Sequence, residues 1–129
     1  MNLHPEIFHL LIVLSLFQLK HFVCDGPLQS KAMVDQKSTY GATLGLAHSA
    51  IHGAGTLAVV LLSGFGGLIA VGMAVADAVV HYHIDFGKEN IIKAQGWTVK
   101  DGPFWWALSA DQMLHQFTYL IVAAFLFQP

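Results

Sequence analysis

The sequence contains no arginine and a single cysteine, and only 11% of its 129 residues are charged, whereas soluble domains carry about 25%. Without arginine or a run of lysines, the chain has no basic surface of the kind that binds nucleic acid. The lone Cys24 excludes an intrachain disulfide and a zinc site built on a C-x-x-C motif. A charged soluble domain, a nucleic-acid-binding domain and a disulfide-stabilised domain are therefore all excluded.

Apolar residues make up 55% of the chain, which is too many for a disordered segment, because disorder needs low hydrophobicity and high charge. A folded chain of this length exposes a large surface relative to its volume. So few charged residues would leave most of that surface apolar. We therefore expect lipid, rather than water, to surround most of the protein.

Four apolar stretches approach or reach the length of about 20 residues that crosses a bilayer. They cover residues 7–24, 42–62, 68–86 and 104–127. A secretory signal peptide is the alternative interpretation of the first stretch, but no lysine or arginine precedes it. A glycine-rich segment, residues 63–67, predicts a tight turn between the second and third stretches. The sequence thus predicts an all-α membrane protein, with residues 1–129 forming one antiparallel bundle of four transmembrane helices.

The positive charges are distributed unevenly along the chain. All of them lie at the end of the first stretch, in the first loop or in the third loop: Lys20, Lys31, Lys37, Lys88, Lys93 and Lys100. Loops rich in lysine stay on the cytoplasmic side of a membrane. We therefore expect the first and third loops to be cytoplasmic, both termini to lie on the other side, and the protein to reside in the cell's inner membrane.

Each predicted helix carries a pair of ionisable side chains four residues apart, which places both on one helix face. The pairs are His21 with Asp25, His48 with His52, His81 with Asp85, and Asp111 with His115. Because neighbouring helices run in opposite directions, all four pairs fall at the same depth, near the cytoplasmic surface. Ionisable groups inside a membrane are costly and mark functional sites. We expect the four faces to meet in one buried polar site.

Imidazole and carboxylate side chains are good ligands for transition metals, and helix bundles build metal sites from such inward-facing residues. The predicted ligands, for one or two divalent ions with zinc favoured, are His21, Asp25, His48, His52, His81, Asp85, Asp111 and His115. The candidate catalytic residues are Asp25 and Asp111, as general bases, and Lys88, which can hold an anionic headgroup or phosphate. Haem is a weaker alternative, because carboxylates at the same level fit badly beside an apolar macrocycle.

Other residues have simpler explanations. His9 and His83 are expected to form hydrogen bonds between helices, as single membrane histidines commonly do. Asp77 is either a carboxylate that supports the ligands or a protonated structural group. Small residues share the face of His48 and allow a neighbouring helix to approach closely, namely Gly41, Gly45 and Gly55.

The motifs, in this order, resemble those of the DUF3307 family of small bacterial and phage membrane proteins. The matching segments are His21-Phe-Val-Cys-Asp25-Gly-Pro-Leu-Gln29, His48-Ser-Ala-Ile-His52, His81-Tyr-His-Ile-Asp85-Phe-Gly-Lys88 and Asp111-Gln112-Met-Leu-His115. Gly26-Pro27 departs from the family pattern, and the proline is expected to end the first helix. The resemblance implies a membrane protein with a polar site, and no particular activity. A weaker likeness is to membrane-embedded metal-dependent hydrolases.

Four functions agree with this pattern. We favour a metal-dependent hydrolase that acts on a lipid-linked or amphiphilic substrate near the cytoplasmic face. The alternatives are a carrier of protons or metal ions, a haem bundle, and a structural or partner-binding subunit of a homo-oligomer or larger membrane complex. A carrier would need ionisable groups through the full depth of the membrane, and the outer half of this chain has few.

Overall fold

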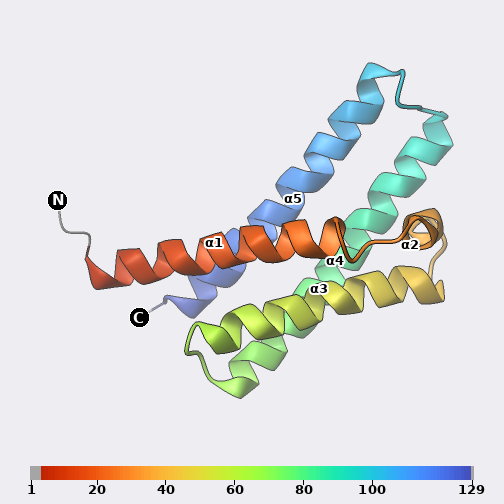
Figure 1. The fold of residues 1–129 in the computed structure, drawn as a ribbon. Coiled ribbons are helices and arrows are strands. Elements are labelled where there is room, and N and C mark those ends of the chain that lie inside the picture. Colours follow the sequence, from red (N-terminus) through yellow and green to blue (C-terminus); the bar gives the residue numbers. More distant parts are fainter. Residues whose placement is uncertain (1–3, 129) are drawn as a thin grey trace.

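The computed structural model describes residues 4–128, and the chain is all-α over this range (Figure 1). Its helices are α1 (Pro5–Asp25), α2 (Lys31–Gln36), α3 (Thr43–Leu62), α4 (Gly67–Gln95) and α5 (Gly102–Leu126). The four long helices coincide with the four predicted apolar stretches. The short helix α2 lies in a segment that was expected to be a loop.

The ends of α1 and α4 have different causes. Helix α1 ends at Asp25, as the following Gly26-Pro27 predicts, because proline cannot continue a helix. The expectation that the third helix ends near residue 86 is wrong, since α4 continues for nine more residues to Gln95. Gly87 lies inside the helix and does not interrupt it. The helix stops instead at Gly96, which takes the left-handed conformation (φ 66°) common at helix ends.

The helices pack as two overlapping hairpins (Figure 1). Helices α3 and α4 are joined by a tight turn in which Gly64 has a φ of +86°, and they form the closest pair in the fold. Helix α5 returns along α4, and α1 packs across both α3 and α5. The last turns of α4 and the first turns of α5 extend together beyond the rest of the bundle (Figure 1).

The interior of the bundle has an apolar half and a polar half. The apolar half lies near the α3–α4 turn and consists of Val13, Phe17, Val59, Val60, Ala70, Tyr119, Val122 and Leu126. The polar half lies toward the end of α1 and contains buried histidine, aspartate and lysine side chains. A water-soluble bundle differs from this one, because its interior is apolar throughout.

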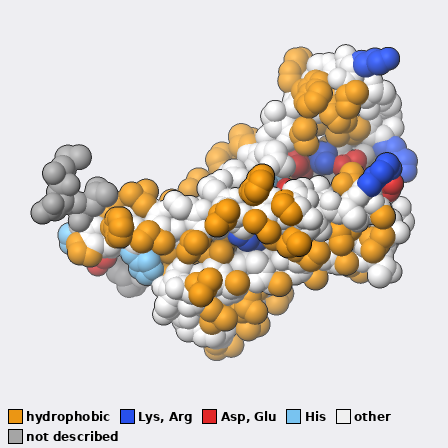
Figure 2. Space-filling view, in the orientation of Figure 1, with side chains coloured by type: hydrophobic (Ala, Val, Ile, Leu, Met, Phe, Trp, Pro, Cys, Tyr) orange, Lys and Arg blue, Asp and Glu red, His pale blue; other side chains and the backbone are white. Residues whose placement is uncertain are grey.

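The outer surface is largely apolar. Large side chains such as Phe22 on α1, Leu68 on α4 and Phe117 on α5 are half or more exposed. Figure 2 shows hydrophobic side chains over much of the visible surface, while charged ones gather near α2 and at the α4–α5 turn. Three helices, α1, α3 and α4, are long and apolar enough to cross a membrane. Helix α5 is not among them, because polar residues around Asp111 and His115 interrupt its apolar sequence.

Glycine allows α3 to approach its neighbours closely. A Cβ atom on Gly53 would lie 2.9 Å from the Ala74 carbonyl oxygen of α4, and one on Gly55 would lie 2.8 Å from Cγ of Lys20. The close approach predicted at Gly55 is therefore present. The close approach at Gly53 was not predicted from the sequence. The one predicted at Gly41 is not found among the described residues, since a Cβ there would meet no atom within 4 Å.

Replacing Gly53 by alanine is expected to lower the free energy of unfolding in detergent by about 1–3 kcal/mol, because α3 and α4 must move apart. Gly72→Ala on α4 is the matched control, since its new Cβ meets no atom within 4 Å. There alanine should be neutral or stabilising by up to about 1 kcal/mol through its higher helix propensity. Equal effects of the two substitutions on the unfolding midpoint would contradict the close packing of α3 against α4.

Candidate metal centre

The structure brings all eight predicted ligands into one region of the polar half. They come from the end of α1, the first half of α3, the second half of α4 and the middle of α5: His21, Asp25, His48, His52, His81, Asp85, Asp111 and His115. Six of the eight side chains are nearly or completely buried, at 0–4% exposure; His21 is 7% exposed, and only Asp25 is classed as half-buried. The helical spacing of four residues, read from the sequence, is what aims each pair inward.

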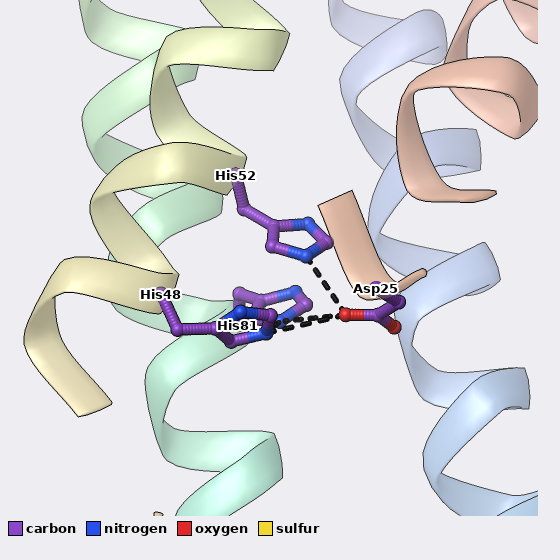
Figure 3. A group of neighbouring side chains, drawn as sticks. All are labelled: Asp25, His48, His52 and His81. Atoms are coloured by element: carbon purple, nitrogen blue, oxygen red, sulfur yellow. Dashed lines mark hydrogen bonds and ion pairs between the residues drawn. The ribbon is translucent and has the colours of Figure 1, made fainter. Parts of the chain in front are cut away.

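Four of these residues form a compact group around Oδ1 of Asp25 (Figure 3). This oxygen lies 2.9 Å from Nε2 of His52, 3.2 Å from Nε2 of His48 and 3.9 Å from Nε2 of His81. The two nitrogen atoms of His48 and His81 are 3.2 Å apart. All three imidazoles therefore present the same ring nitrogen to one carboxylate oxygen. We call Asp25, His48, His52 and His81 the four-donor group.

The spacing of the four-donor group fits one tetrahedrally coordinated ion. Zinc binds imidazole nitrogen and carboxylate oxygen at about 2.0–2.2 Å, so two ligand atoms in a regular tetrahedron are about 3.3 Å apart. Four of the six donor separations lie between 2.9 and 3.9 Å, around this value, and all six are within 4.8 Å. In addition, Nδ1 of His48, His52 and His81 has no hydrogen-bond partner within the described residues. The orientation of the three rings is therefore set by the contacts of Nε2 and not by a hydrogen bond at Nδ1.

A second group shares one member with the first. His81, Asp85 and His115 also place one donor atom each within 4.8 Å of one another. Nε2 of His115 lies 3.5 Å from Oδ1 of Asp111 and 3.6 Å from Oδ1 of Asp85. A neutral imidazole nitrogen has a single lone pair, so Nε2 of His81 can serve only one of the two groups. The two groups are therefore not two complete and independent metal sites.

Two buried lysines neutralise two of the carboxylates. Nζ of Lys37, which follows α2, lies 2.8 Å from Oδ2 of Asp85. Nζ of Lys20 on α1 lies 2.6 Å from Oδ2 of Asp77, which also accepts a 2.6 Å hydrogen bond from the Thr56 hydroxyl. Asp77 is therefore a buried partner of a lysine, on the side of the site nearer the apolar half. Both lysines are buried in ion pairs, although the count used to predict topology included both as charges near the membrane surface.

His21 contacts the four-donor group from behind. Its Nε2 lies 3.1 Å from Oδ2 of Asp25, the oxygen that faces away from the other histidines, and 2.9 Å from Oε1 of Gln112. Its Nδ1 lies 2.9 Å from the Tyr119 hydroxyl. His21 belongs to neither group of potential ligands in the described residues. Gln29, past the end of α1, donates to the Asp25 backbone carbonyl (2.9 Å) and so covers the end of the helix.

An apolar groove of about 590 Å³ runs between α4 and α5 beside the site. Apolar side chains such as Val80, Ile84 and Leu114 line most of it. Two charged residues, Lys88 and Asp111, also lie in its wall. Lys88 forms an ion pair with its neighbour Glu89, whereas Oδ1 of Asp111 has no hydrogen-bond partner.

The remaining polar residues make local contacts. His9 donates from Nε2 to the Ser63 carbonyl at the α3–α4 turn (3.0 Å). His83 is exposed and bonds to the Val79 carbonyl of its own helix. The His9 contact joins separate elements, as expected. The bond between helices expected for His83 is not found among the described residues, because His83 bonds within α4 and lies 3.3 Å from the Tyr40 hydroxyl. Cys24 is buried, with its thiol near the Ile51 carbonyl.

Sequence reasoning missed the roles of Lys20, Lys37 and Tyr119. A signal for one of them was present, because Lys20 and Asp77 are the two charged residues within the predicted spans that belong to none of the four pairs. An unpaired charge in lipid is very costly, so the presence of one of these residues predicts that it forms an ion pair with the other. Lys37 gave no such signal, since it lies in an irregular segment.

Comparison with known proteins supports the resemblance drawn from the motifs. No curated protein and no solved structure matches this chain. One family model does match, over residues 11–129, and its description is "Protein of unknown function (DUF3307)". The match includes all four motifs and nearly the whole bundle. The chain therefore belongs to the DUF3307 family.

Proposed function

We propose that the protein is an integral membrane hydrolase that uses one divalent metal ion, with zinc favoured, to act on an amphiphilic or lipid-linked substrate. The observation that carries the proposal is the four-donor group, in which three histidine Nε2 atoms and one carboxylate oxygen converge within a few ångströms. Histidine and carboxylate are the ligands that zinc prefers. Such a set is difficult to explain as packing alone, because Nε2 of His48 and Nε2 of His81 lie 3.2 Å apart and both face the same carboxylate oxygen.

The buried charges support one ion rather than two. The described part of the site holds four carboxylates, on Asp25, Asp77, Asp85 and Asp111, against the two ammonium groups of Lys20 and Lys37. With neutral histidines, this leaves two negative charges. An uncompensated buried charge is strongly disfavoured. One divalent cation neutralises the site, whereas two would leave it positive.

The three histidines suffice to hold an ion, which leaves Asp25 free for chemistry. A catalytic zinc site uses three protein ligands and keeps a fourth position for water. The Asp25 side chain is 20% exposed, while those of His48, His52 and His81 are fully buried, so the fourth position faces the more open side. Bound divalent metal makes such a water easy to deprotonate. Asp25, within hydrogen-bond distance of two of the ligands, is placed to accept the proton.

The groove between α4 and α5 supports an amphiphilic substrate. Its volume of about 590 Å³ lies in the range of small-molecule sites, about 300–1,000 Å³. Its walls are almost entirely apolar, and Asp111 connects it to the site through His115. An acyl or prenyl chain would occupy the apolar part. Lys88 would hold an anionic headgroup, and Asp111, whose Oδ1 accepts no hydrogen bond from the described residues, would contact the polar end.

We further propose that α5 is the fourth transmembrane helix and that the polar half faces the cytoplasm. One side of α5 exposes large apolar side chains, including Phe117, Leu120, Ile121 and Phe125. Asp111, Gln112, His115 and Tyr119 face the site instead. The four lysines outside the buried pairs, Lys31, Lys88, Lys93 and Lys100, still lie at one end of the bundle.

The purified protein is expected to bind about one equivalent of zinc, as its charge balance requires. The double substitution His48→Ala/His81→Ala should abolish this binding, since it removes two of the three nitrogen ligands. Elemental analysis after metal loading and dialysis measures both. His83→Ala is the matched control, because His83 lies two residues from His81 but is exposed and should not affect binding. A folded wild-type protein that retains no metal would overturn the proposal.

Membrane topology is testable with single cysteines in a Cys24→Ala background. Gly66 in the α3–α4 turn and Lys100 in the α4–α5 turn are both exposed, and a Cβ on Gly66 would meet no atom within 4 Å. In intact cells, a membrane-impermeant maleimide should label Gly66→Cys, and it should label Lys100→Cys only after permeabilisation. The opposite pattern would place the metal centre on the outer face.

Hydrolysis is expected to depend on the groove and on Asp25 separately. Gly87 lines the groove, and a Cβ there would meet no atom within 4 Å, so Gly87→Leu should occupy the groove without disturbing the bundle. With long-chain and short-chain fluorogenic carboxylic and phosphoric esters, Gly87→Leu should lower kcat/KM for the long-chain esters only. Asp25→Asn should lower kcat for both and weaken metal binding without abolishing it, because the three histidine ligands remain. Loss of metal in Asp25→Asn would instead make Asp25 a ligand of a closed, structural site.

A further inference from the structure

A chain of hydrogen bonds, closed by one ion-pair contact between His21 and Asp25, connects the Lys20–Asp77 ion pair to the four-donor group. Lys20 Nζ lies 2.6 Å from Asp77 Oδ2 and 3.2 Å from the Tyr119 hydroxyl. The same hydroxyl lies 2.9 Å from Nδ1 of His21, whose Nε2 lies 3.1 Å from Oδ2 of Asp25. Every member except Asp25 is at least nine-tenths buried. Asp25 is the one member of this chain that lies at the proposed metal ion. Lys20, Asp77, Tyr119 and His21 lie behind it and contact no ligand nitrogen of the four-donor group.

The ammonium group of Lys20 sets the direction of every hydrogen bond in the chain. It has three N–H donors and no acceptor, so the Tyr119 oxygen must accept from it. The hydroxyl hydrogen of Tyr119 then has one partner among the described residues, Nδ1 of His21. If Nδ1 carried its own proton, the Tyr119 hydroxyl would be a buried donor without an acceptor, which costs the full desolvation penalty.

The consequence is a single tautomer for His21. Because Nδ1 accepts, the neutral ring carries its proton on Nε2, and this N–H faces Oδ2 of Asp25 and Oε1 of Gln112. Both of these atoms are acceptors. The amide of Gln112 agrees with this direction, since its Nε2 donates to Oδ2 of Asp111 (3.1 Å) and its Oε1 is left to accept from His21.

We propose that His21 is a positioning residue rather than a metal ligand, and that Lys20, Asp77 and Tyr119 hold it as an Nε2–H donor that aims Asp25 at the three ligand histidines. The inference rests on the proposed metal site, and it assigns a function to the four residues that lie behind Asp25. A donor on Oδ2 holds the carboxylate so that Oδ1 faces His48 and His52. Groups that orient metal-site residues in this way commonly change metal affinity 10–100-fold when removed.

The ion pair is better explained by this role than by stability. Replacing a buried ion pair with apolar side chains of similar volume is often neutral or stabilising. An apolar pair at Lys20 and Asp77 would, however, release the Tyr119 oxygen to accept from Nδ1–H of His21. The ring would then turn its Nε2 lone pair toward the carboxylate of Asp25, and that contact is repulsive. Stability alone does not require the lysine, but the direction of the hydrogen bonds does.

The first test is the tautomer of His21 in the metal-free protein. Long-range proton–nitrogen NMR of the ¹⁵N-histidine-labelled protein in detergent reports which ring nitrogen carries the proton, and His21→Gln assigns the signal. We expect Nε2–H in the wild type. The double substitution Lys20→Met/Asp77→Leu removes the pair without leaving a buried charge, and it should shift the ring toward Nδ1–H. An Nδ1–H tautomer in the wild type would overturn the inference, whether or not the protein binds metal.

The second test is metal affinity and coordination. Tyr119→Phe and the Lys20→Met/Asp77→Leu variant should lower Co²⁺ affinity about 10–100-fold and alter the visible Co²⁺ spectrum. Tyr82→Phe is the matched control, because Tyr82 is also a buried tyrosine beside a ligand, but its hydroxyl accepts from the Gly41 N–H. If both variants matched Tyr82→Phe in affinity and spectrum, the inference would fail while the metal site stood.

A third variant separates a positioning residue from a ligand. In His21→Gln the amide N–H can replace the Nε2–H donor, so metal affinity should stay within a few-fold of the wild type, whereas His21→Ala should lower it about 10–100-fold. If His21→Gln lost metal as completely as the ligand substitution His48→Ala, His21 would be a ligand and the inference would be wrong. A wild type that binds no Co²⁺ would overturn the metal site itself.

Discussion

Neutralising carboxylates inside an apolar environment is the requirement on which the rest of this structure depends. An isolated ionised carboxylate is prohibitively costly to bury, yet the described part of the bundle buries or half-buries four of them. Asp77 and Asp85 are paired with lysines at 2.6 and 2.8 Å. Asp25 has histidines on both of its oxygen atoms. Asp111 forms no ion pair with a lysine among the described residues, and its Oδ1 accepts no hydrogen bond there. It is also the carboxylate that lines the groove.

The position of the two lysines determines where the site is negative. Lys20 neutralises Asp77 on the side of the apolar half, and Lys37 closes the site from the segment between α1 and α3. The uncompensated charge therefore remains on Asp25 and Asp111, next to the buried histidine nitrogens. A cation would be drawn to that place by the charge distribution alone. The same two residues are the ones that the groove and the exposed side of Asp25 leave accessible to a substrate.

Much of this arrangement could be predicted from the sequence. The parts that could not be predicted share one cause. The period of the helix and the alternating helix directions predicted that residues such as His48 and Asp85 meet at one depth. Those rules do not say which ring nitrogen faces the centre, so they could not separate His21 from the ligand histidines. Nor do they reach residues outside regular helices, which is why Lys37 was missed. The third apolar stretch ends at residue 86, although α4 continues to Gln95, because hydropathy marks where a helix leaves the lipid and not where it ends.

The division of the bundle argues for chemistry at one face rather than for passage through it. Beyond the Thr56 and Tyr119 hydroxyls, the interior consists of Val13, Val60, Val122 and their neighbours. The next polar contact is that of His9 at the α3–α4 turn. A proton or metal ion would have to cross this apolar layer without a ligand, at a cost that transport proteins avoid by placing polar groups along the path. A purely structural network, in turn, does not require a carboxylate such as Asp111 in the wall of an apolar groove. Both features agree with the proposed hydrolase, whose substrate would approach from the lipid.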